Sequence, residues 1–79
     1  MVNIKVVGTG CANCNKLVDI CKEVINEYKI EATVSKVTDI NQFADLGIFM
    51  TPGLIINDVV KSSGKLPTKS TLEHWIKQA

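Results

Sequence analysis

A short apolar stretch that runs through a glycine turn into a long amphipathic segment most constrains the fold. Val2 to Val7 is rich in β-branched residues and alternates before it turns fully apolar, which predicts a strand. Gly8-Thr9-Gly10 follows as a turn. From Cys11 to Tyr28, apolar residues recur at steps of three and four, the pattern of a helix that packs on a sheet. These positions are Cys14, Leu17, Val18, Cys21, Val24, Ile25 and Tyr28.

Two cysteines, Cys11 and Cys14, lie where this helix should begin. The first backbone N–H groups of a helix have no intrahelical partner and its N-terminus is positive, so a thiolate is stabilised there. Two intervening residues keep the Cα atoms about 5 Å apart, a separation that a disulfide tolerates. We therefore hypothesise a reversible dithiol/disulfide couple with Cys11 as the exposed nucleophile.

The third cysteine, Cys21, belongs to the apolar stripe rather than to this pair. It lies seven residues after Cys14, about 10 Å along a helix, which is too far for a disulfide. We expect Cys21 to be a small core residue, as most unpaired cysteines are. A backup thiol or a third ligand is the alternative.

The rest of the chain adds three strands and two helices. Ile30–Val37 alternates and predicts a second strand; Asp39 is a suitable N-cap for a short helix that ends at Gly47. The apolar run Leu54–Ile56, the turn Asn57-Asp58 and the stretch Val59–Ser63 predict a hairpin.

A final amphipathic helix carries Leu72, Trp75 and Ile76 and starts from a cap at Thr68 or Ser70. The predicted order is β-α-β-α-β-β-α. A strand–helix–strand unit gives a parallel pair and the hairpin adds antiparallel strands. We therefore expect an α/β fold: one domain, residues 1–79, with a four-stranded mixed sheet and helices on both faces.

Composition excludes several functional classes. A net charge of +1 with scattered lysines argues against a nucleic-acid partner, and no apolar run is long enough for a membrane span. The N-terminal residues pass straight into a strand pattern rather than a signal peptide. Three cysteines in such a chain favour redox or metal chemistry in a reducing compartment, so we expect a cytoplasmic protein. We also expect a monomer, because the predicted elements leave no obvious exposed apolar stripe.

At this point the whole chain resembles a small thioredoxin/glutaredoxin-like protein, closest to the compact members called redox-active disulfide proteins. The resemblance depends on Cys11-Ala12-Asn13-Cys14 at the strand–helix junction, on Thr51-Pro52 before the third strand, and on the closing hairpin and helix with Gly64 between them. It implies an oxidoreductase that needs no cofactor, with Cys11 as nucleophile and Cys14 as the resolving thiol.

The resemblance also implies the substrate site and the partners. Pro52 would be a cis-proline beside the disulfide, and Thr51 would offer backbone hydrogen bonds to an extended substrate. A trans proline that merely starts the strand is the alternative. The implied partners are disulfide-bearing proteins and, as electron donor, a flavin-dependent enzyme like thioredoxin reductase. Phe49 and Met50, just ahead, either form an apolar rim for a partner or belong to the core, which we favour for Phe49.

The chain departs from the family pattern in its charges and in its motif. It lacks the Trp before the first cysteine and the Gly-Pro or Pro-Tyr pair between the cysteines. The first strand has no buried acid; Lys5 is its only charge and would favour a thiolate if it approached the site. Lys16 is a second source of electrostatic support, or an ordinary solvated lysine.

The main rival interpretation is a module that binds a soft metal such as Cu(I) or Zn(II) through the same cysteines. Such domains typically carry a Met where Thr9 stands and close with a strand instead of a helix. A closed zinc site also needs four ligands, and the single histidine, His74, is expected on the last helix as a surface residue. A structural domain with a vestigial motif is a further alternative. We expect no bound metal.

Overall fold

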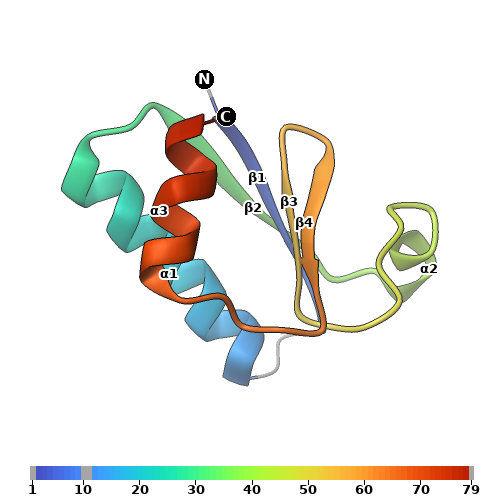
Figure 1. The fold of residues 1–79 in the computed structure, drawn as a ribbon. Helices are drawn as coiled ribbons and strands as arrows, with labels where there is room; N and C mark the ends of the chain where they lie inside the picture. Colours follow the sequence, from blue (N-terminus) through green and yellow to red (C-terminus); the bar gives the residue numbers. More distant parts are fainter. Residues whose placement is uncertain (1, 10–11, 79) are drawn as a thin grey trace.

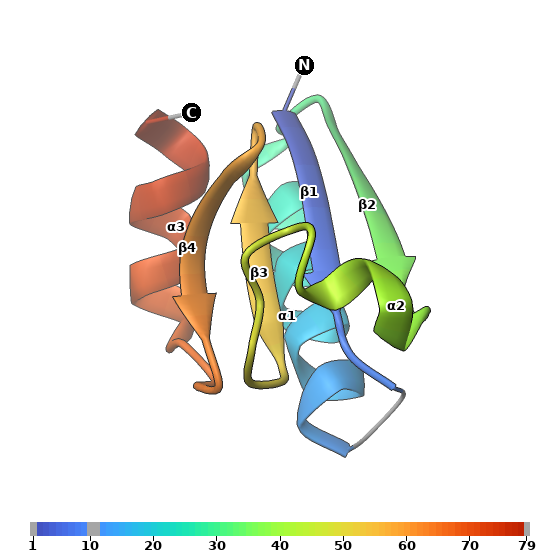
Figure 2. The ribbon, with the colours of Figure 1, turned by 90° about the vertical axis from the view of Figure 1, so that its right-hand side faces the viewer.

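The computed structural model describes residues 2–9 and 12–78. Four strands form one mixed sheet in the order β2-β1-β3-β4 (Figure 2). β1 (Val2–Val7) pairs in parallel with β2 (Ala32–Val37), and helix α1 (Ala12–Tyr28) connects the two. β3 (Gly53–Ile56) is antiparallel to β1, and β4 (Val59–Ser63) is antiparallel to β3. The predicted element order and the mixed sheet are confirmed.

The sheet separates two apolar clusters of different size. α1 and α3 (Lys69–Gln78) cover one face, and the short α2 (Ile40–Phe43) lies at one end of the other (Figure 1). Because side chains alternate across a strand, Val6 joins the larger cluster under α1 and α3, whereas Val7 joins the smaller one near α2. The smaller cluster consists of Val7, Phe43, Ile48 and Ile55. Helices on both faces are therefore confirmed.

Local interactions fix the starts of two helices and the hairpin turn as the sequence indicated, but α2 ends at Phe43 and does not continue to Gly47 as predicted, because residues 44–47 form a turn. Asp39 accepts a hydrogen bond from the Asn41 amide at 3.0 Å and caps α2. The hairpin turn has positive φ at both Asn57 and Asp58, the backbone of a type I′ turn. At the start of α3, the Thr71 amide donates to Thr68 Oγ1 at 3.3 Å, so Thr68 is the cap.

Two expectations at the end of α1 are wrong. The second strand begins at Ala32, not Ile30, because the Ile30 amide donates back to the Ile25 carbonyl at 3.0 Å and closes the helix instead of joining the ladder. Tyr28 continues the apolar stripe in sequence, yet it is exposed. The Lys77 ammonium lies 3.9 Å from the centre of its ring, a cation–π contact between α3 and α1.

The packing of α1 on β1 supports the whole site, so we expect its removal to be costly. Leu17→Ala deletes a fully buried side chain from the larger cluster and should lower the free energy of unfolding by about 2–5 kcal/mol. Urea denaturation under reducing conditions measures this loss. Lys22→Ala, at an exposed position of the same helix, is the control and should change stability by about 0.5 kcal/mol or less. Equal losses in both variants would contradict the assignment.

Candidate active site

Cys14 is the third residue of α1 and is buried. Cys14 is the first of the apolar residues on the sheet-facing side of α1, which continue with Leu17, Val18 and Cys21. This helical spacing determines its position. The first turn of α1 contains no acidic residue, so nothing there offsets the positive end of the helix dipole. Cys11, the predicted nucleophile, lies outside the described residues.

Gly8 packs directly against the Cys14 sulfur. A Cβ atom at residue 8 would overlap Cys14 Sγ, and it would lie 3.8 Å from Thr51 Cβ. Gly8, the residue after β1, therefore has the side chains of both Cys14 and Thr51 close to its Cα atom. Glycine is needed here for the close approach of its backbone, because the clash involves a short, buried side chain rather than a flexible one.

Thr51 and Pro52 lie in a segment that hydrogen bonds hold on both sides. The peptide bond between them is cis; Thr51 is exposed and Pro52 is buried. The Ser63 hydroxyl donates to the Met50 carbonyl at 3.1 Å, and the Gly64 amide donates to the Pro52 carbonyl at 2.9 Å. The end of β4 thus fixes the backbone on either side of Thr51, next to Cys14.

The expectation that Phe49 belongs to the core is wrong. Its side chain is 83% exposed, and that of Met50 is 64% exposed. Ile48, one residue earlier, fills the smaller cluster instead: its amide donates to the Phe43 carbonyl at 2.9 Å, and its side chain packs closely on Gly53. With Ile48 buried in this cluster, the side chains of Phe49 and Met50 remain exposed to solvent. We call these two side chains the apolar rim.

A small hollow of about 10 Å³ lies beside Cys14, about the size of one water molecule. It is lined by Val6, Gly8, Cys14, Asn15, Val18 and Lys36. Lys36 is the charged residue among these, and its ammonium donates to Asn15 Oδ1 at 3.5 Å. No acidic side chain belongs to this described lining. The local charge beside Cys14 is therefore positive.

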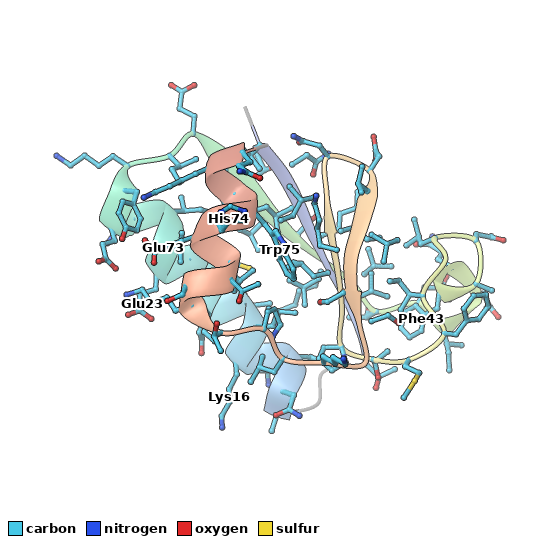
Figure 3. The ribbon with its side chains drawn as sticks, viewed as in Figure 1. Lys16, Glu23, Phe43, Glu73, His74 and Trp75 are labelled. Carbon is cyan, nitrogen blue, oxygen red and sulfur yellow. The ribbon has the colours of Figure 1, made fainter. Side chains whose placement is uncertain are left out.

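The structure does not bring the two lysines named from the sequence to this hollow. Lys5 faces the side of the sheet away from α1, and its Nζ lies 3.8 Å from Asp58 Oδ1 in the hairpin turn, at the opposite end of the sheet. Lys16 is exposed and points away from the strands (Figure 3). Lys36 is a site residue that alternation along its strand does not reveal. Its place beside the hollow follows from the parallel register of the structure, which pairs Val6 with Lys36.

Cys21 is a core residue, as expected. It is fully buried in the larger cluster, and burial raises the pKa of its thiol to about 12. A thiol that stays protonated at neutral pH is a poor nucleophile and a poor metal ligand. The two buried cysteines of α1 therefore have different surroundings: Cys21 lies among apolar side chains, and Cys14 lies beside Gly8, Thr51 and the hollow.

Clusters of metal-ligating groups and long apolar helices are both absent from residues 2–9 and 12–78. No three His, Cys, Asp or Glu side chains in that part of the chain gather as a metal site would require. Within the same residues, no helix has the length and apolar character needed to cross a membrane. His74 is exposed on α3 (Figure 3).

Comparison with known proteins identifies relatives along nearly the whole chain. Residues 2–77 match the family model described as a thioredoxin domain. The chain is 38% identical over 77 residues to a thioredoxin of Methanocaldococcus jannaschii, covering 98% of this chain and 88% of that protein. It is 32% identical over 73 residues to a thioredoxin of Methanothermobacter thermautotrophicus, covering 92% of this chain and 95% of that protein.

The contact between Gly8 and Cys14 gives a direct test of the site geometry. Gly8→Ala forces its new methyl group into Cys14 Sγ, so we expect the free energy of unfolding to fall by about 1–3 kcal/mol through overpacking. We also expect large shifts of the Cys14 and Thr51 amide resonances in NMR spectra. Thr9→Ala, at the exposed neighbouring position, should change neither property appreciably. An unchanged Cys14 resonance in Gly8→Ala would contradict the arrangement.

Proposed function

We propose that this chain, which belongs to the thioredoxin family of thiol–disulfide oxidoreductases, reduces disulfides in proteins through Cys11 and Cys14. The observation that carries the proposal is the position of Cys14. Its sulfur lies at the start of a long helix, packed on Gly8 beside the exposed Thr51. A resolving thiol needs this placement, because it must be shielded from solvent and yet lie close to the bound substrate.

The reaction consists of two thiol–disulfide exchanges. The Cys11 thiolate attacks one sulfur of the target disulfide, forms a mixed disulfide and releases the first target thiolate. The Cys14 thiolate then attacks Cys11 Sγ, forms the Cys11–Cys14 disulfide and releases the second. Two electrons pass from the dithiol to the target, and the two protons lost by the cysteines balance those taken up by the target thiolates. Both rates depend on how much of the attacking thiol is ionised.

Thr51 and Pro52 are proposed to bind the substrate backbone. Thr51 is exposed on a segment fixed by Ser63 and Gly64, so its peptide groups are held ready to pair with an extended segment of the target. An enzyme like thioredoxin reductase is the proposed electron donor. We expect the protein to act as a monomer in the reducing environment of the cytoplasm.

The roles of the two cysteines predict different defects when each is replaced. Cys11→Ser should abolish reduction of a protein disulfide such as that of insulin, because no attacking thiolate remains. Cys14→Ser should lose turnover and accumulate a mixed disulfide with the target, visible as a dithiothreitol-sensitive mass increase. A Cys11→Ser protein that still reduced insulin at the normal rate would overturn the assignment.

A redox titration of the unmodified protein provides the control. We expect a single two-electron transition that consumes Cys11 and Cys14 and leaves Cys21 as a thiol, counted by mass after alkylation of the unfolded protein. A midpoint near or below about −270 mV, the value of thioredoxin, agrees with a reductase. Failure of the pair to form, or its protection by a stoichiometric metal ion, would overturn the proposed function.

The apolar rim predicts a preference for protein substrates over small disulfides. Phe49→Ser should raise the KM for a protein disulfide about 3- to 10-fold, because a side chain that is 83% exposed can lose much of that area to a bound target. Reduction of bis(2-hydroxyethyl) disulfide, which has no apolar flank, should be unaffected. Steady-state kinetics with both substrates measure the difference.

Ile40→Ser is the matched control for this effect. Ile40 is a similarly exposed apolar residue, 68% exposed, but it lies at the start of α2 and not in the segment that leads to Thr51. Its replacement should leave both KM values within about 2-fold. Equal effects of Phe49→Ser and Ile40→Ser would show that general surface hydrophobicity, and not the rim, determines binding.

A further inference from the structure

The second exchange requires that Cys14 lose its proton in a buried place. Cys14 is only 4% exposed, and a thiol in apolar surroundings resists ionisation. A carboxylate could accept the proton, but no acidic residue belongs to the described lining of the hollow beside Cys14. The positive end of the α1 dipole favours the thiolate, and a nearby cation would add to that effect.

Lys36 is placed to do so by the parallel pairing of β1 and β2. The register sets Lys36 beside Val6, on the side of the sheet that α1 covers. From there its side chain reaches the first turn of α1, where Nζ donates to Asn15 Oδ1 at 3.5 Å. Asn15 directly follows Cys14. Both residues line the hollow, together with Val6 and Lys36. The strand pairing thus places the Lys36 ammonium at the first turn of α1, next to the proposed resolving thiol.

The other charged groups on the elements around Cys14 do not occupy this position. On α1, Lys16 and Asp19 are exposed and are absent from the lining of the hollow. On β1, Lys5 lies on the opposite face of the sheet and pairs with Asp58. The segment that carries Thr51 contributes no charge between Phe49 and Gly53. Lys36 is therefore the charge most directly associated with Cys14 in the described part of the site.

We propose that Lys36 supports the resolving step by stabilising the Cys14 thiolate across the hollow, in place of a proton-accepting carboxylate. The Cys14 thiol gives its proton to water at the hollow, whose outer lining, Asn15 and Lys36, is exposed. The thiolate then attacks Cys11 Sγ, and the target sulfur leaves with the electron pair of the broken bond and takes up a proton from solvent. The inference rests on the proposed function, because it assigns a residue to one of its steps.

The expected effect is moderate because Lys36 is exposed and water screens its charge. An opposite charge close to a titrating group moves its titration midpoint by about one to three pH units. Because water screens Lys36, we expect its effect on Cys14 to lie at or below the lower end of this range. We therefore expect loss of the charge to raise the pH at which Cys14 is half ionised by about 0.5 to 1 unit. Near pH 7, that shift lowers the thiolate fraction about 3- to 10-fold.

The test measures Cys14 ionisation in a protein that cannot undergo the redox reaction. In a Cys11→Ser background, a ¹³C label on cysteine Cβ reports the titration of Cys14 by NMR, and Cys21 stays separate because its pKa is about 12. Lys36→Gln should raise the Cys14 midpoint, and Lys36→Arg, which keeps the charge, should leave it within about 0.2 unit. Lys16→Gln is the matched control, with the same loss of charge on α1 away from the hollow, and should give less than half the shift. Added salt screens exposed charges, so it should reduce the difference in Cys14 midpoint between the protein with Lys36 and the Lys36→Gln variant.

A second measurement, with both cysteines present, connects the titration to the reaction. Lys36→Gln should slow release of the target from a preformed mixed disulfide on Cys11 about 3- to 10-fold at pH 7 and little at pH 10, whereas a purely structural role would slow it at both. An unmoved Cys14 midpoint in Lys36→Gln, or an equal shift in Lys16→Gln, overturns the inference even if the redox couple is normal. Absence of a Cys11–Cys14 couple overturns the proposed function instead, and the redox titration detects that separately.

Discussion

The packing of the apolar stripe of α1 on β1 is the interaction on which the rest of the site depends. Leu17, Val18 and Cys21 fix the rotation of the helix on the sheet, and this rotation aims Cys14 at the end of β1. Gly8 then allows the sulfur to approach the backbone without an intervening side chain. A cysteine on any other face of α1 would meet solvent and not Gly8, so the apolar pattern of the helix also determines which sulfur lies where the proposed resolving step needs it.

The sheet places the remaining groups around that sulfur. β1 is a central strand, so its end is flanked by the end of β2 on one side and by the start of β3 on the other. β2 supplies Lys36, and the segment before β3 supplies Thr51. One parallel and one antiparallel neighbour are both needed, because only then do the C-terminal end of β2 and the N-terminal end of β3 meet beside Cys14. The mixed sheet is therefore a requirement of the site and not just a feature of the fold.

Much of this arrangement could be predicted from the sequence where the signals are local. The periodicity of α1, the type I′ turn at Asn57-Asp58 and the Asp39 cap each depend on interactions within a few residues, and the structure agrees with them. The burial of Phe49 was predicted wrongly because Ile48, Phe49 and Met50 are all apolar. The sequence does not indicate which of the three fills the smaller cluster. Lys36 was missed because its neighbour, Asn15, is 21 residues away and only the strand register connects them.

The role proposed for Lys36 uses a positive charge where a carboxylate would otherwise act. A carboxylate beside a buried thiol acts by accepting its proton, and burial makes it a better acceptor because it raises the pKa of the carboxyl group. A lysine acts differently, since it lowers the free energy of the thiolate and leaves the proton to water. That alternative needs contact with solvent, and the exposed Asn15 and Lys36 beside Cys14 supply it. Lys5, which the sequence places nearer to the cysteines, cannot take this role because alternation along β1 turns it to the other face, where it pairs with Asp58.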